Sequence, residues 1–216
     1  MDKGLFLRNL EIFTKHDRLI SVTHDIAPGE VLTVMGPSGV GKSTLLAGVI
    51  GTLSPDFRMV GEIWLDGVNI TLLPPRLRKI GIMFQDDLLF PHLSVGQNLA
   101  FGLKPGGTRA DRAAKVTAAL NEVGLEGFEA RDPATLSGGQ KARVALMRML
   151  LSEPSALLLD EAFSRLDATL RAQVRDLVFQ RAKDRNLPVL MVTHDVEDAR
   201  AACGPIIDLG RQSGSV

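Results

Sequence analysis

The stretch VLTVMGPSGVGKST, residues 31–44, decides how this chain folds. Residues 31–35 form an apolar run, which is typical of a strand buried on both faces of a sheet. GPSGVGKS, residues 36–43, matches the pattern G-x-x-x-x-G-K-[ST] at every fixed position, and a helix is expected over 42–50, ended by Gly51. A tight turn without a ligand is the alternative, but a strand before the motif and a helix after it are what a phosphate-binding loop requires.

The residue types of this loop suit a phosphate chain. Gly36, Gly39 and Gly41 allow the backbone to curl, so that its N–H groups point at phosphate oxygens. Lys42 adds a full positive charge for the β- and γ-phosphates, and the Ser43 hydroxyl is a ligand for Mg²⁺. The positive end of the following helix also favours anions. The residues of this loop expected to contact the nucleotide are Gly36, Pro37, Ser38, Gly39, Val40, Gly41, Lys42, Ser43 and Thr44.

A second apolar run, ALLL at 156–159, ends in the acidic pair Asp160 and Glu161. Ligands of open α/β sheets collect at the carboxyl ends of the strands, where this pair would lie. Side chains alternate along a strand, so the two carboxylates are expected to point in different directions. We assign Asp160 to Mg²⁺, through water, and Glu161 to the attacking water as general base. A helix N-cap is the alternative role for such a pair.

Strand patterns occupy both ends of the chain. Short strands are expected in the first sixty residues, and a hairpin over 61–70 around Asp66-Gly67. PVLMV, residues 188–192, is a further buried strand. The helix before it has apolar residues on one side, and its arginines are expected on a solvated face. These arginines are Arg171, Arg175 and Arg181.

Helical patterns fill the middle of the chain. Thr108 and Asp111 resemble a capping box ahead of one helix, and another helix is expected from Gly138 to about Leu151. We therefore predict an α/β fold of the P-loop NTPase (RecA-like) type, with a mostly parallel sheet, an N-terminal antiparallel β part and an inserted α-helical subdomain. The single domain 1–216 would have a core of 1–86 and 153–216 and a helical insertion of 87–152.

Composition excludes several classes of protein. Lys+Arg and Asp+Glu both number 25, so no overall charge attracts the chain to nucleic acid, and no nucleic-acid partner is expected. Cys203 is the single cysteine; it is expected to be a small buried apolar residue in a reducing compartment. No run approaches the roughly 20 apolar residues of a membrane span, and the charged N-terminal stretch does not look like a signal peptide.

LSGGQ, residues 136–140, is a second glycine-rich helix start, but it has no lysine. Ser137 can cap the helix, and Gly138 and Gly139 allow a ligand to approach the backbone closely. Without a lysine this segment suits half of a site, closing over a phosphate that is held elsewhere. An ordinary N-cap is the alternative.

LSGGQ, with the phosphate loop upstream and LLLDE downstream, resembles the signature of ATP-binding cassette (ABC) ATPases. The resemblance covers nearly the whole chain and implies ATP and Mg²⁺ as cofactors. It also implies a homodimer with two-fold symmetry and head-to-tail pairing, in which each LSGGQ covers the ATP on its partner's phosphate loop. Ser137, Gly138, Gly139 and Gln140 would then contact nucleotide.

The same resemblance implies roles for residues outside these motifs. Gln85 in IMFQDD would reach Mg²⁺ and the attacking water, and His194 in MVTHD would contact the γ-phosphate. Phe13 would stack on adenine, with core packing as its alternative. SRLD, residues 164–167, resembles the D-loop and would lie at the subunit seam. The sequence departs from the family at Ala162, where proline is usual, and at Arg165, where a small residue or Asn is usual.

The partner is also implied by resemblance. In transporters of this family, the region matching DDLLFPHLSVGQNL (86–99) receives a short cytoplasmic helix of the membrane subunit; alternatively its apolar residues pack under the helical lobe. The chain resembles bacterial importer ATPases for thiamine, iron, molybdate, sulfate or polyamines. This implies a cytoplasmic, peripheral membrane ATPase with permease subunits and a periplasmic solute-binding protein. A soluble ABC ATPase acting on DNA or the ribosome is the alternative, and a P-loop kinase would leave LSGGQ and His194 unused.

Overall fold

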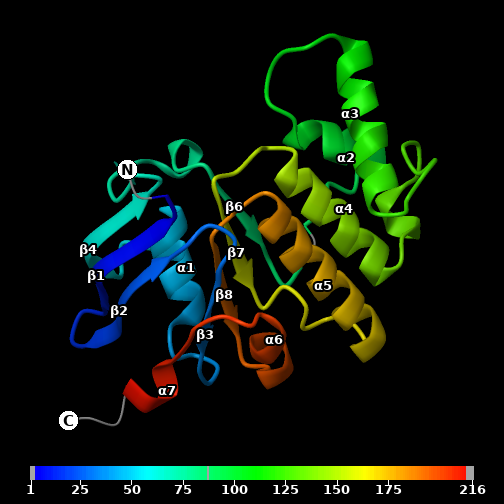
Figure 1. Ribbon diagram of the computed structural model, residues 1–216. Coiled ribbons are helices and arrows are strands. Elements are labelled where there is room, and N and C mark those ends of the chain that lie inside the picture. Colours follow the sequence, from blue (N-terminus) through cyan, green and yellow to red (C-terminus); the bar gives the residue numbers. More distant parts are fainter. Residues whose placement is uncertain (1–2, 87, 213–216) are drawn as a thin grey trace. The chain divides into compact units, whose positions relative to one another are not determined.

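The computed structural model describes residues 3–86 and 88–212, which fall into two compact units (Figure 1). The first unit holds the chain up to Ile82, Ser155–Glu161 and the segment from Phe179 onward; the second holds Met83–Pro154 and Ala162–Val178. Asp87, the first residue of the predicted insertion, lies outside the described residues. No helix in the described ranges combines the length and the apolar character of a bilayer span.

An antiparallel sheet opens the first unit, with strand order β2-β1-β4-β5. Its strands are β1 (Leu5–Phe13), β2 (Arg18–Ile26), β4 (Arg58–Leu65) and β5 (Val68–Asn69). The expected hairpin is confirmed between β4 and β5, where Asp66 and Gly67 both have positive φ (49° and 78°). Two positive φ angles in a two-residue loop match the twist of the flanking strands, which is why Asp-Gly is favoured there.

The second sheet of this unit has the order β6-β7-β8-β3-β9. Its strands are β6 (Ile80–Met83), β7 (Ala156–Asp160), β8 (Val189–Thr193), β3 (Val31–Met35) and β9 (Ile206–Asp208). Strand β8 pairs in parallel with both β3 and β7, and β3 pairs in parallel with β9. The predicted strand over 188–192 is shifted by one residue. The α/β fold with an antiparallel part and a mostly parallel sheet is confirmed.

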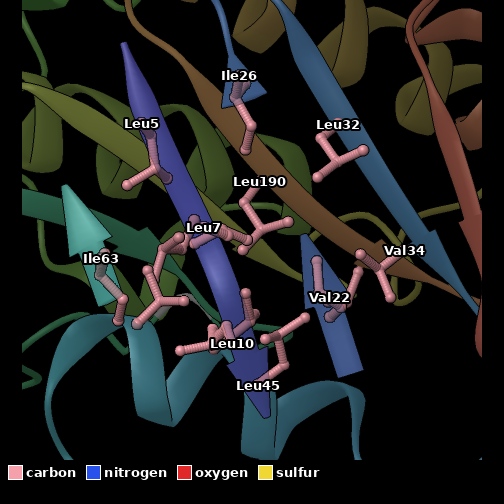
Figure 2. Packing of buried hydrophobic residues seen from close by; sticks show 14 of the residues in the cluster. Leu5, Leu7, Leu10, Val22, Ile26, Leu32, Val34, Leu45, Ile63 and Leu190 are labelled. Carbon is pink, nitrogen blue, oxygen red and sulfur yellow. The ribbon is translucent and has the colours of Figure 1, made fainter. Parts of the chain in front are cut away.

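One apolar core joins the two sheets (Figure 2). Leu5, Leu7 and Leu10 of β1 and Leu32 and Val34 of β3 are each fully buried in it. Helix α1 (Lys42–Ile50) follows the phosphate loop and ends at Gly51, which has a φ of 90°. The helix adds its own apolar side chains, Leu45, Leu46 and Val49, to this core. Burial of each such side chain contributes about 1.5–3 kcal/mol, so the loop is anchored by the helix behind it.

A buried arginine holds the far end of α1. Arg78 follows the short helix η1 (Pro75–Leu77) and is 5% exposed. Its guanidinium donates hydrogen bonds to the carbonyls of Leu73 (2.7 Å), Gly48 (2.9 Å), Val49 (2.8 Å) and Thr71 (2.6 Å). Gly48 and Val49 belong to the last turn of α1, whose carbonyls lack partners within the helix. Burial lowers the pKa of Arg78 from its ordinary value.

The second unit is helical. It contains α2 (Val95–Gly102), α3 (Arg109–Glu122), η2 (Pro133–Thr135), α4 (Gly138–Leu150) and the first part of α5 (Ala168–Asp184). The predicted capping box of Thr108 and Asp111 is confirmed at the start of α3. Helices α2 and α4 approach each other so closely at Gly102 that a Cβ there would overlap the carbonyl of Arg148. Helices α6 (Val196–Ala201) and α7 (Leu209–Gln212) belong to the first unit.

A buried amide fixes the loop before α2. Asn98 is fully buried and accepts a hydrogen bond from the Phe90 N–H at 2.8 Å. Its NH₂ group donates to the carbonyls of Phe90, Leu93 and Ser94, each at 3.1 Å. Arg148 donates to the Leu88 carbonyl at 2.9 Å. The polypeptide from Leu88 to Ser94 is thus shaped by two side chains from neighbouring helices.

Two expectations were wrong. Arg171, Arg175 and Arg181 on α5 are partly buried, not solvated: the Arg175 side chain is 13% exposed and that of Arg181 26%. Arg175 lies 3.7 Å from Asp176 and Arg181 lies 3.5 Å from Asp184, and arginine can bury its aliphatic stem while its charged end stays paired in this way. Cys203 is exposed, at a φ of 51° in the turn after α6. Apolar character alone did not predict its position in a turn.

Candidate active site

The order of the parallel strands brings three predicted segments together. Strand β8 lies between β3 and β7, with Met35 opposite Thr193 and Asp160 opposite Val192. The phosphate loop follows β3, the acidic pair ends β7, and His194 follows β8. Because these strands are parallel, their carboxyl ends share one edge of the sheet, where ligands of such sheets bind.

The phosphate loop has the backbone of an anion cradle. Gly39 and Gly41 have φ angles of 83° and 104°, which glycine adopts without strain. A Cβ on Gly41 would lie 2.9 Å from Leu19, whereas one on Gly39 would meet no described atom within 4 Å. Helix α1 starts with no capping side chain from the described residues and no acidic residue in its first turn. Its first N–H groups therefore suit an anionic ligand.

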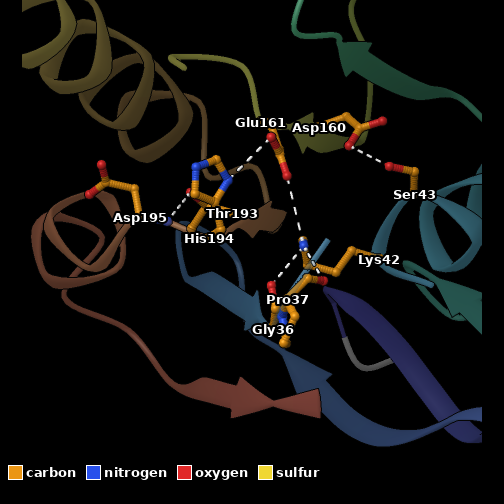
Figure 3. Close-up of polar contacts among 9 residues, drawn as sticks. All are labelled: Gly36, Pro37, Lys42, Ser43, Asp160, Glu161, Thr193, His194 and Asp195. Atoms are coloured by element: carbon orange, nitrogen blue, oxygen red, sulfur yellow. Dashed lines mark hydrogen bonds and ion pairs between the residues drawn. The ribbon is translucent and has the colours of Figure 1, made fainter. Parts of the chain in front are cut away.

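Lys42 points into the loop that precedes it (Figure 3). It is 5% exposed, and its Nζ donates to the carbonyls of Gly36 (2.8 Å) and Pro37 (3.0 Å). Glu161 Oε1 is 3.8 Å from Nζ, beyond hydrogen-bond reach. Carbonyl dipoles thus hold a buried ammonium in place. A phosphate would supply the full negative charge that such a buried cation favours, so the loop fits a nucleotide.

Asp160 faces the start of α1. The Ser43 hydroxyl donates to Asp160 Oδ1 at 3.0 Å. Burial raises the pKa of Asp160 above its ordinary value, while the hydrogen bond from Ser43 opposes this shift. A half-buried carboxylate beside a hydroxyl fits Mg²⁺, which takes oxygen ligands and typically keeps waters and phosphates in its shell. The described residues contain no cluster of three or more acidic, His or Cys side chains suited to a metal, so such an ion would need the nucleotide as well.

Glu161 points away from Asp160, toward Lys42 and His194 (Figure 3). Its Oε2 is 3.3 Å from His194 Nδ1, and the Glu161 side chain is 22% exposed. The backbone at Glu161 has a φ of 45°, a conformation that costs energy for a residue other than glycine. The expected divergence of the two carboxylates is observed. The divergence was predicted from the alternation of side chains along a strand, and the left-handed backbone of Glu161, directly after β7, contributes to it as well.

The segment that carries His194 is fixed on both sides. The N–H of Asp195 donates to Thr193 Oγ1 at 3.0 Å, and Asp195 caps α6 by accepting from the N–H groups of Glu197 and Asp198. The His194 ring itself is 55% exposed. Sequence reasoning missed this support, although an aspartate directly before a short helix is the usual signal of an N-cap.

Phe13 ends β1 and is only partly buried. The guanidinium carbon of Arg58 lies 4.4 Å from its ring centroid, a cation–π contact. The ring is therefore not fully enclosed in the core. Stacking on adenine stays a prediction for Phe13.

The remaining predicted residues lie in the helical unit. Ser137 and Gln140 form a reciprocal capping box at the start of α4, so the expected cap is observed. Gly139 is buried, and a Cβ there would overlap the Leu170 side chain of α5. A Cβ on Gly138 would make only ordinary contact with Leu166, at 3.6 Å. Gln85, which follows β6, is exposed.

The parallel sheet and its phosphate loop define a P-loop nucleoside triphosphatase. The family model described as ABC transporter matches residues 19–164, and the chain belongs to this family as the ATP-binding subunit of a transporter.

Relatives and a solved structure agree with this assignment. An uncharacterized ABC transporter ATP-binding protein, YnjD, of Escherichia coli (strain K12) is 46% identical over 210 residues, 97% of this chain and 96% of the relative. A thiamine import ATP-binding protein, ThiQ, of Jannaschia sp. (strain CCS1) is 45% identical over 185 residues, 84% of this chain and 79% of the relative. The structure of cbiO1 from Clostridium perfringens, part of the ABC transporter complex cbiONQ, matches with a TM-score of 0.83 and 30% identity, covering 97% of this chain and 86% of that one.

Proposed function

We propose that this chain is a Mg²⁺-dependent ATPase that powers a bacterial importer of small solutes from the cytoplasmic face of the membrane. The observation that carries the proposal is the placement of Glu161 between Lys42 and His194, beside the Ser43–Asp160 pair. This arrangement supplies a phosphate cation, a general base and a metal ligand at one sheet edge. The descriptions of the relatives as ATP-binding proteins of an ABC transporter and of thiamine import favour transport over action on DNA or the ribosome.

In this proposal, each side chain of the site has a separate task. Lys42 would hold the β- and γ-phosphates of ATP, while Ser43, Asp160 and Gln85 would hold Mg²⁺. Bound Mg²⁺ would neutralise phosphate charge. Glu161 takes a proton from the attacking water, and His194, held beside it, contacts the γ-phosphate. A positioned base contributes about 10²–10⁴ in rate.

Replacing the proposed base tests this arrangement directly. Glu161→Gln should keep ATP affinity, because the amide is nearly isosteric, and lower the turnover rate by at least about 10²-fold. Glu126→Gln, at an exposed position of the helical unit, is the matched control and should hydrolyse ATP normally. Phosphate release and ATP binding would be measured on the same preparations. Normal turnover by the Glu161→Gln variant would contradict the role of Glu161.

We also propose that two copies pair head to tail, with LSGGQ of one copy covering the phosphate loop of the other. The contrast between the two helix starts supports this: α1 has no cap from the described residues, whereas α4 is capped by its own Ser137 and Gln140. A self-capped helix start without a lysine suits a lid and not an independent phosphate site. ATP-driven closure of the dimer would then move permease subunits, with a periplasmic solute-binding protein delivering the cargo.

A complementation experiment tests the pairing. Lys42→Ala damages the phosphate loop, and Gly138→Glu damages the lid while the fold tolerates the added side chain at this open position. Each variant alone should be inactive. Mixed one to one, they should regain about a quarter of wild-type activity, because random pairing restores one intact site in half of the dimers. A mixture as inactive as its components would show that each copy uses its own LSGGQ or none.

A further inference from the structure

A cavity of about 540 Å³ lies within the helical unit and is lined by three separate segments. Gln85 and Asp86 contribute from the segment after β6, Gly138 and Lys141 from the start of α4, and Arg165 from the D-loop-like segment SRLD. Three stretches that carry predicted site residues therefore share one space. A contact across this space would couple the position of Gln85 to that of the SRLD segment.

Such a contact is present. Arg165 Nη1 forms an ion pair and hydrogen bond with Asp86 Oδ1, across 79 residues of sequence. Asp86 is the residue directly after Gln85. Arg165 is also the position at which this chain departs from its family's usual small residue or Asn. A side chain of that size lacks the reach and the charge of a guanidinium, so the contact depends on the departure itself.

We propose that Arg165 is a positioning residue, which latches the Gln85 segment to the SRLD segment and holds Gln85 ready for hydrolysis. The proposal rests on the proposed function, because it assumes that Gln85 acts in ATP turnover. Both partners of the latch are exposed, at 61% for Arg165 and 52% for Asp86. The latch is therefore weak and sensitive to salt, unlike a buried pair.

The size of the effect follows from this exposure. An exposed ion pair is worth at most about 1 kcal/mol, which corresponds to about a fivefold change in the latched population. Arg165→Gln is therefore expected to lower kcat about threefold while KM for ATP stays within about twofold. Asp86→Asn should have the same effect, and the double variant should be no slower than either single variant, because the latch is lost only once.

Ionic strength separates a latch from a general structural effect. The ratio of wild-type kcat to that of the Arg165→Gln variant should fall toward one as KCl rises from about 20 mM to about 500 mM, since salt screens the wild-type pair. Arg165→Lys should retain part of the rate. Arg109→Gln, which removes an exposed arginine from the same unit, is the matched control and should leave kcat unchanged at every salt concentration.

Two results would overturn the proposal: rate losses of the two single variants that multiply in the double variant, or a kcat ratio that does not depend on salt. A failure of the proposed function is distinguishable from these outcomes. If wild-type protein hydrolyses ATP and Glu161→Gln does not, the ATPase proposal stands whatever Arg165 does. Thermal unfolding of each variant would show that a lost rate does not reflect a lost fold.

Discussion

Replacing Arg78 by methionine is expected to lower the free energy of unfolding by about 4 kcal/mol or more. The guanidinium donates four hydrogen bonds of 2.6–2.9 Å to backbone carbonyls. Hydrogen bonds from a charged donor are worth roughly 1.5–3 kcal/mol each, and their sum is reduced because water reaches some of the freed carbonyls. Two of those carbonyls, on Gly48 and Val49, close the helix that starts at the phosphate loop.

The measurement is urea unfolding followed by circular dichroism, in the absence of nucleotide. Arg78→Lys should lose about 2 kcal/mol less than Arg78→Met, because an ammonium still donates up to three hydrogen bonds. Arg76→Met, at an exposed position two residues away, is the control and should change stability by less than about 0.5 kcal/mol. If Arg78→Met costs less than about 1 kcal/mol, the carbonyls do not depend on this side chain and the reasoning fails.

The other predictions concern the site and the loop before α2. Lys42→Ala should weaken ATP binding at least about tenfold by calorimetry, because the loop loses the full positive charge that pairs with the phosphates; unchanged affinity would contradict this. Asp160→Asn should abolish the stabilisation by Mg²⁺-ATP, yet make the nucleotide-free protein more stable at neutral pH. Burial raises the pKa of Asp160 above 3.8, so its contribution to stability is fully present below pH 3.8 and is lost as the pH rises through the raised pKa. The stability gap between this variant and wild type should therefore close in acid; a gap that does not depend on pH would argue against a raised pKa. Asn98→Leu should cost about 2 kcal/mol or more in urea unfolding, because the buried backbone groups of Phe90 lose their partner; a neutral change would mean that water replaces the amide.

The phosphate loop and the strands around it could be predicted because their signals are local. An apolar run, the glycine spacing and the lysine of 31–44 specify a strand, a turn and a helix within fourteen residues. Two further buried strands lead to chemically distinctive residues: Asp160 is the last residue of β7, and His194 follows β8. Parallel pairing around β8 gathers their ends without any additional information.

Contacts between distant side chains could not be predicted in this way. Arg78 donates to the carbonyls of Val49 and Gly48, which are 29 and 30 residues away in the sequence. Arg165 pairs with Asp86 across 79 residues. Neither contact has a periodic signal, because periodicity records which face of an element is apolar and not which polar groups meet. The prediction of a solvated face for the arginines of α5 was wrong for the same reason. Their charge suggested solvent, whereas the side chains are partly buried, as the long stem of arginine allows.

The overlap that a Cβ on Gly139 would make with Leu170 constrains how this chain can evolve. The Leu170 side chain occupies the volume that a larger residue at 139 would need, so a side chain at 139 requires Leu170 to move or to be replaced by a smaller residue. Among related sequences, a side chain at the first should be accompanied by a smaller residue at the second. Retention of glycine at 139 in LSGGQ would then reflect the space that Leu170 occupies as well as the close approach of a nucleotide.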